Sequence, residues 1–77
     1  MIIEFQHEVV CGVHRFYPRN RYGTLICELA GRKALRSPDI HNLYVLGIKF
    51  EAYAKDRKLE YAEIQKIIQS KFKEPGT

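Results

Sequence analysis

The sequence predicts a small α+β domain, in which an N-terminal antiparallel β-hairpin is followed by two α-helices packed on one face. Three observations support this fold class: an N-terminal third rich in β-branched and aromatic residues, a helix-start signal near residue 37, and an amphipathic pattern over residues 59–73. A chain of 77 residues has room for one domain, 1–77, because it buries only about 60% of the surface that the unfolded chain exposes.

The hairpin is expected over about residues 2–30. The stretch 2–16, IIEFQHEVVCGVHRF, has the composition of one long strand or two short ones, and the stretch 22–31, YGTLICELAG, is expected to be the partner strand. Between them, YPRNRYG contains a proline, an asparagine and a glycine, which accept turn geometry. The sequence therefore predicts a hairpin with a basic tip.

Alternation of side chains along a strand predicts two apolar rows in this hairpin. The rows are Val9, Cys11 and Val13 on the first strand and Leu25, Cys27 and Leu29 on the second. Pairing these rows places both cysteines in the core. Gly12 lies within the first strand, where a glycine can mark a bulge that resets the alternation after it.

A first helix is expected over about residues 38–57. Ser37 can cap backbone N–H groups, Pro38 fits the first helical position, and Asp39 favours the positive end of the helix dipole. The stripe expected to be buried is Ile40, Leu43, Gly47, Phe50 and Ala54. Glycine costs about 1 kcal/mol relative to alanine in a helix, so another backbone is expected to pack closely against Gly47. The alternative is a third strand over residues 43–50, because LYVLGIKF is almost continuously apolar.

A second amphipathic helix is expected over about residues 59–73, LEYAEIQKIIQSKFK. Its inward side is expected to consist of Tyr61, Ile64, Ile67 or Ile68, and Phe72, and EPGT should end it. The two predicted helices are not separated by a strong breaker, so one long kinked helix is the alternative. A two-stranded sheet gives a thin core, which favours a homodimer that completes the sheet or the helical layer.

Composition and cysteine content indicate a folded cytoplasmic protein. Apolar residues make up 45% of the chain and charged residues 29%, as in globular proteins. Charged residues interrupt the N-terminal MIIEFQHE where a signal peptide needs an apolar run, and no segment approaches the ~18 apolar residues of a membrane span. The two cysteines are expected to be free thiols in a reducing compartment.

The net charge of +4 is concentrated in one third of the chain. Residues 14–36 contain six Lys or Arg residues and one Glu, whereas residues 1–13 carry a net charge of −2 and residues 37–77 a net charge of +1. Clustered positive charge attracts phosphate groups, acidic protein surfaces and anionic membranes.

The stretch 14–23, HRFYPRNRYG, is the main candidate binding segment. Its arginines can neutralise phosphates and its aromatic rings can stack on unpaired bases, a combination suited to single-stranded nucleic acid or RNA loops. Basic residues of the connector before residue 37 would extend the surface if that connector folds beside the hairpin tip. The candidate residues are Arg15, Tyr17, Arg19, Arg21, Tyr22, Arg32, Lys33 and Arg36.

The sequence therefore predicts a small non-catalytic nucleic-acid-binding protein, with single-stranded nucleic acid or RNA as the favoured partner. The alternative is a protein-interaction module, such as a small inhibitor or regulatory subunit, that binds an acidic face of a partner protein. The residue types alone do not separate the two, because arginine and tyrosine are also enriched at protein interface hot spots.

No metal, cofactor or enzymatic activity is expected. Zinc-compatible side chains are present at His7, Cys11, His14, Cys27 and His41, and CGVH has the spacing of a zinc knuckle. In a regular strand, however, Cys11 and His14 point to opposite faces, so only a turn at Gly12 would bring them together. Catalysis of RNA cleavage by His14 with its arginine and tyrosine neighbours is the enzymatic alternative, but no motif fixes their geometry.

Overall fold

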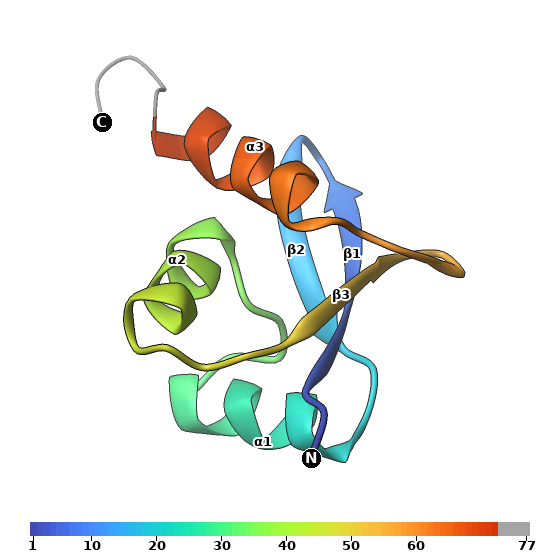
Figure 1. Ribbon diagram of the computed structural model, residues 1–77, viewed down its shortest axis with the longest axis vertical. Helices are drawn as coiled ribbons and strands as arrows, with labels where there is room; N and C mark the ends of the chain where they lie inside the picture. The colour runs from blue at the N-terminus through green and yellow to red at the C-terminus, as the bar shows by residue number, and fades with distance from the viewer. Residues whose placement is uncertain (73–77) are drawn as a thin grey trace.

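A computed structural model describes residues 1–72 and confirms the α+β class, with a four-stranded mixed sheet and three helices in this part of the chain (Figure 1). The elements in chain order are β1 (Glu4–Val10), β2 (Val13–Pro18), α1 (Arg21–Ala30), α2 (Ser37–Val45), β3 (Glu51–Ala54), β4 (Arg57–Lys58) and α3 (Tyr61–Phe72). The strand order is β2-β1-β3-β4; β1 pairs antiparallel with β2 and parallel with β3, and β4 is antiparallel to β3.

The N-terminal hairpin is present, but it turns at Cys11 and Gly12. β1 and β2 pair in register from Phe5 opposite Pro18 to the residues that flank the turn. The φ angles of Cys11 and Gly12 are 53° and 76°, the left-handed geometry of a two-residue turn that matches the twist of the strands. The stretch 2–16 thus contributes two short strands, Gly12 is a turn residue and not a bulge, and Cys11 is exposed and not in the core.

The prediction of a second strand at residues 22–31 is wrong, because this segment is α1. Asn20 caps the helix by accepting a hydrogen bond from the N–H of Gly23 at 3.0 Å, and Gly31, with φ of 73°, ends it. The predicted hairpin tip is therefore the junction between β2 and α1.

The helical geometry of α1 also separates the apolar row expected on the partner strand. Successive residues of a helix are rotated by about 100°, so alternate residues do not share a face. Cys27 is buried as expected, but Leu25 and Leu29 are 48% and 85% exposed. The residues on the buried face of α1 are Gly23 and Cys27, four positions apart.

The first predicted helix begins one residue earlier than expected, because Arg36 and not Ser37 is its N-cap, and it ends early. α2 starts at Ser37, with Pro38 in its first turn, and stops at Val45. Residue 47 is a glycine with φ of 77°, and a Cβ added there would meet nothing within 4 Å, so the close backbone contact expected at Gly47 is absent.

The segment after α2 forms the β3–β4 hairpin, so the expected helix over residues 46–57 is wrong. The alternative strand over residues 43–50 is also wrong, because the observed strand starts at Glu51. β3 pairs with β1, placing Ala52 beside Phe5, and both side chains are fully buried. The apolar core formed with a strand 47 positions earlier in the chain thus outweighs the local preference for continuing α2.

The last predicted helix is confirmed as α3. Ile64 and Ile68 are buried, while Tyr61 is 65% exposed and not inward as predicted. Lys73 and the ending EPGT lie outside the described residues, as does the side chain of Phe72.

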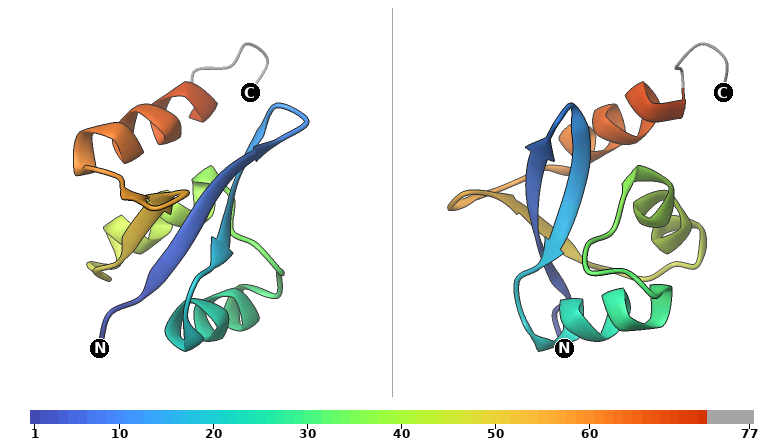
Figure 2. Two further views of the ribbon diagram at one scale, coloured as in Figure 1. Left: turned by 90° about the vertical axis from the view of Figure 1, so that its right-hand side faces the viewer. Right: turned by 180° about the vertical axis from the view of Figure 1, so that it is seen from behind.

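The helices cover one side of the sheet. Figures 1 and 2 show α2 and α3 on this side and α1 packed across the lower end of the β1–β2 hairpin. The core lies between these layers and includes Phe5, Phe16, Leu35, Ile40, Ala52 and Ile68. Within residues 1–72, no helix is both long enough and apolar enough to cross a membrane.

Candidate nucleic-acid interface

The connector between α1 and α2, residues 31–36, runs along the outer edge of β2 (Figure 2). Phe16 and Leu35 exchange backbone hydrogen bonds: the N–H of Phe16 donates to the carbonyl of Leu35 at 2.8 Å, and the N–H of Leu35 donates to the carbonyl of Phe16 at 2.9 Å. Both side chains are buried, at 0% and 1% exposure, so core packing fixes this bridge.

The Phe16–Leu35 bridge fixes the positions of the residues on either side of it. In an antiparallel pair, the residues that flank the bridge also face each other, which puts Arg36 opposite Arg15 and Ala34 opposite Tyr17. Because Phe16 and Leu35 point into the core, their neighbours point toward the other face. The structure thus brings Arg15, Tyr17 and Arg36 together along one edge of the sheet.

Arg15 is half-buried, and its Nε is a buried donor without a hydrogen-bond partner among residues 1–72. Glu8 lies opposite it in β1, but no ion pair within 4.0 Å joins the two side chains. A buried N–H without an acceptor costs about 1–3 kcal/mol.

The basic residues of the connector differ in how much of their charge is neutralised. The Nε of Arg32 lies 3.6 Å from the carboxylate of Asp39, which also accepts the backbone N–H of Arg36 at 3.1 Å and so caps α2. Lys33 and Arg36 are exposed, and neither forms an ion pair within the described part of the chain. We call Arg15, Tyr17, Lys33 and Arg36 the connector edge.

Arg19 is used to hold the fold together. Its Nη1 donates to Gln6 Oε1 and to the carbonyl of Lys55, both at 2.9 Å. Its Nε lies 3.9 Å from the carboxylate of Glu4, and its guanidinium lies over the ring of Tyr53, 3.9 Å from the centroid. These contacts tie the end of β2 to β1 and to the β3–β4 turn, so Arg19 is a structural residue first.

Arg21 and Tyr22 lie at the start of α1, away from the position expected at a hairpin tip. The guanidinium of Arg21 lies 5.5 Å from the ring centroid of Tyr22, and Tyr22 packs against the core cluster. The observed tip, at Cys11 and Gly12, carries no basic residue. Of the eight predicted binding residues, the structure brings Arg15, Tyr17 and Arg36 together at the Phe16–Leu35 bridge, and Arg32 and Lys33 lie in the same connector. Arg19, Arg21 and Tyr22 lie outside the connector edge.

A histidine pair on β1 and β2 was not predicted as a unit. Nε2 of His7 and Nδ1 of His14 are 2.9 Å apart and share a hydrogen bond, and the rings are stacked with centroids 5.1 Å apart. Burial, with a smaller effect from His14, lowers the pKa of His7 below its ordinary value of 6.5. The sequence signal for this contact is a two-residue turn at Cys11 and Gly12, because it pairs His7 with Phe16 and Val9 with His14 and so makes the histidines diagonal neighbours on one face. No group of three or more His, Cys, Asp or Glu side chains able to hold a metal ion is found over residues 1–72.

Comparisons of the chain with protein-family models, with curated proteins and with solved structures find no match. The assignment of a function therefore depends on the geometry of the chain itself.

Proposed function

We propose that the protein binds single-stranded nucleic acid at the connector edge and is not an enzyme. The observation that supports this most is the Phe16–Leu35 bridge, which sets Arg36 opposite Arg15 and Ala34 opposite Tyr17. Arginine and lysine neutralise backbone phosphates, and a tyrosine ring on the same edge offers a surface on which a base can stack.

A single strand suits this edge better than a duplex. Its backbone can follow a short row of cations while an unstacked base turns toward the tyrosine, whereas the bases of a duplex stay stacked inside it. Three cations, Arg15, Lys33 and Arg36, are available at this edge. Because each neutralised phosphate of a single strand contributes about −0.7, the slope of log K against log salt concentration should be about −2.

The test is fluorescence anisotropy of a labelled single-stranded oligoribonucleotide over a salt series. Lys33→Glu/Arg36→Glu should weaken binding at least about tenfold and flatten the salt slope, because two phosphate contacts become repulsive. The matched control is Lys55→Glu/Lys66→Glu, which makes the same change in net charge on exposed residues outside the connector edge and should change affinity by less than about twofold.

Circular dichroism should show that both double variants keep the wild-type fold. Arg19 is a poor probe because its loss removes contacts to β1 and the β3–β4 turn. Equal weakening by the two double variants, or no saturable binding at low salt, would count against the proposal.

A second candidate function is binding to an acidic protein surface. It is favoured by the outer side of α1, where Leu25 and Leu29 are exposed one turn apart on a helix that begins at Arg21 and ends beside Arg32. Apolar side chains bordered by arginine are typical of protein interfaces. Leu29→Asp should then abolish a protein interaction and leave nucleic-acid affinity unchanged, which a parallel pull-down and anisotropy measurement can separate.

A further inference from the structure

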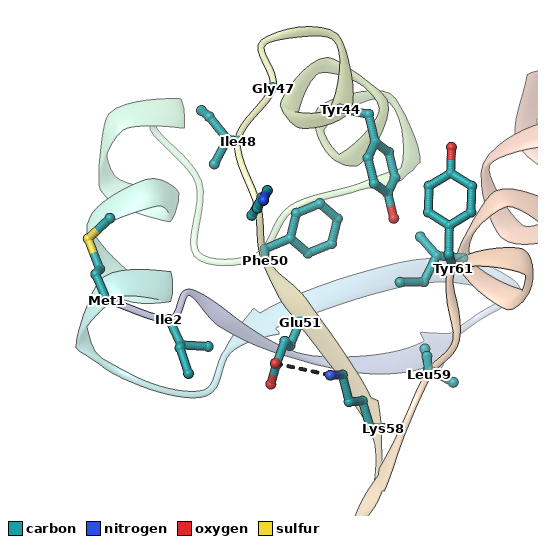
Figure 3. Close-up of a pocket in the computed structure, with 12 residues that line it drawn as sticks. Met1, Ile2, Tyr44, Gly47, Ile48, Phe50, Glu51, Lys58, Leu59 and Tyr61 are labelled. Atoms are coloured by element: carbon teal, nitrogen blue, oxygen red, sulfur yellow. Dashed lines mark hydrogen bonds and ion pairs between the residues drawn. The ribbon is translucent and has the colours of Figure 1, made fainter.

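A cavity of about 660 Å³ lies between the end of α2, β3 and the start of α3, away from the connector edge (Figure 3). Its volume falls within the range of about 300–1,000 Å³ that is typical of small-molecule sites. Most of its wall is apolar and includes Ile2, Tyr44, Ile48, Phe50, Tyr61 and Ile64.

The aromatic part of the wall is held in place by ring contacts. The ring of Phe50 lies 5.1 Å from that of Tyr44 and 5.8 Å from the buried Phe5, and Tyr44 meets Tyr61 edge to face at 5.3 Å. Figure 3 shows Phe50 directed toward Tyr44, with Tyr61 beyond it on α3. Because these contacts fix the wall, the flat ring of a ligand would meet a preformed surface. This reduces the entropy lost on binding.

Three charged residues line the same cavity, and they are not balanced. Lys58 Nζ lies 3.0 Å from the carboxylate of Glu51 (Figure 3). The same carboxylate also accepts a hydrogen bond from the hydroxyl of Tyr53 at 2.9 Å. These contacts satisfy the carboxylate and lower the pKa of Glu51, chiefly through Lys58. Lys49 is exposed and has no ion pair within residues 1–72, so among the charged side chains of the lining only that of Lys49 is uncompensated.

We infer that this cavity binds a small amphipathic monoanion, with an aromatic body against Phe50 and Tyr44 and one carboxylate near Lys49. The apolar wall matches the body, and the unpaired ammonium group of Lys49 matches the carboxylate. Burial and the neighbouring Tyr61 raise the pKa of Tyr44, so its phenol remains a hydrogen-bond donor at neutral pH. This inference is independent of nucleic-acid binding, because it concerns a different part of the surface.

The test uses naphthoate as the probe and naphthalene methanol as its uncharged analogue. Titration of isotope-labelled protein, followed by amide chemical shifts, should give saturable binding of naphthoate with a Kd on the order of 0.1 mM, as expected for a ligand of this size. The shifts should concentrate on residues 44–50 and 58–64, and the uncharged analogue should bind at least about tenfold more weakly because it lacks the contact with Lys49.

Two variants and one matched control complete the experiment. Lys49→Glu should raise the Kd of naphthoate at least about tenfold, whereas Lys33→Glu, the same charge reversal at the connector edge, should leave it unchanged. Tyr61→Ala, at a largely exposed rim residue, should also weaken binding without unfolding the chain. The inference would be overturned if Lys49→Glu bound naphthoate as tightly as wild type does. It would also be overturned if the uncharged analogue bound with equal affinity, or if the chemical shifts changed outside this cavity. Because Lys33→Glu tests the connector edge separately, either proposal can fail without the other.

Discussion

Asn20 illustrates at the residue scale how one side chain joins several parts of the fold. Its Oδ1 accepts hydrogen bonds from the backbone N–H of Gly23 at 3.0 Å and of Glu4 at 3.2 Å, and its Nδ2 donates to the carbonyl of Ile2 at 2.6 Å. The same amide therefore caps α1 and fixes the start of β1. An ordinary helix cap does only the first of these.

Asn20→Ala should lower the free energy of unfolding by about 2–3 kcal/mol, more than the ~1 kcal/mol of a typical cap, because three hydrogen bonds are lost. Asn20→Asp keeps both acceptor contacts and loses the donor, so it should cost about 1 kcal/mol. Urea denaturation followed by circular dichroism measures both values. If the alanine variant lost no more than the aspartate variant, the two hydrogen bonds that Oδ1 accepts, from Gly23 and Glu4, would contribute nothing to stability.

Gly23 controls packing at the scale of whole elements, because it sets how closely α1 approaches β1 and the end of β2. A Cβ placed on Gly23 would overlap the carbonyl oxygen of Glu4 and lie 3.2 Å from the Cα of Pro18. Both atoms belong to the backbone, so neither can move aside by a rotamer change. The helix could accommodate a side chain here only by moving away from the sheet.

Gly23→Ala should therefore destabilise the protein by about 1–3 kcal/mol, although alanine is the better helix former by about 1 kcal/mol. Gly12→Ala is the comparison: it adds the same methyl group where nothing lies within 4 Å, at φ of 76°. Gly12→Ala should lower the free energy of unfolding by only about 1–2 kcal/mol, the cost of left-handed backbone geometry for alanine. It should leave the amide spectrum of α1 unchanged. If Gly23→Ala raised the free energy of unfolding, α1 would not pack against β1 and the end of β2 as closely as described.

At the scale of the whole molecule, stability should fall in two steps as the pH is lowered. The pKa of His7 in the folded protein lies below 6.5, so the unfolded chain binds more protons just below that pH. The contribution of His7 to the free energy of unfolding is fully present above pH 6.5. It is lost as the pH falls through the pKa that His7 has in the folded protein. The second step comes from carboxylates: the paired guanidinium of Arg57, at 2.9 Å through both nitrogens, lowers the pKa of Glu63 from 4.5 to about 2.

Thermal midpoints measured by circular dichroism from about pH 8 to about pH 2 should reveal both steps. His7→Phe should remove the step just below pH 6.5 and keep the ring contact with Phe16, while Glu63→Gln should reduce the step below pH 4.5. Glu63→Gln and wild type should converge as the pH approaches 2, where the native carboxylate is protonated. A wild-type profile that is flat between pH 6.5 and 5 would contradict the assignment to His7.

The sequence alone determined the features that depend on neighbouring residues. Ser37, Pro38 and Asp39 mark the start of α2, and Ile64 marks the buried side of α3, whereas the spacing leaves Ile67 and Ile68 as alternatives. It also located the surplus of positive charge in residues 14–36. The cap at Asn20 and the turn at Gly12 are local signals too, but the alternating apolar residues around them favour a loop and a bulge.

Only the tertiary structure decided where distant segments meet. Residues 51–54 become a strand because they pair with β1 and bury Ala52 against the sheet, a gain that no local pattern of α2 reveals. The connector edge depends in the same way on the pairing of Phe16 with Leu35, and the cavity on the meeting of α2, β3 and α3. The physical reason is that local backbone preferences differ by about 1 kcal/mol or less per residue, whereas burying one large apolar side chain contributes about 1.5–3 kcal/mol and depends on the whole chain.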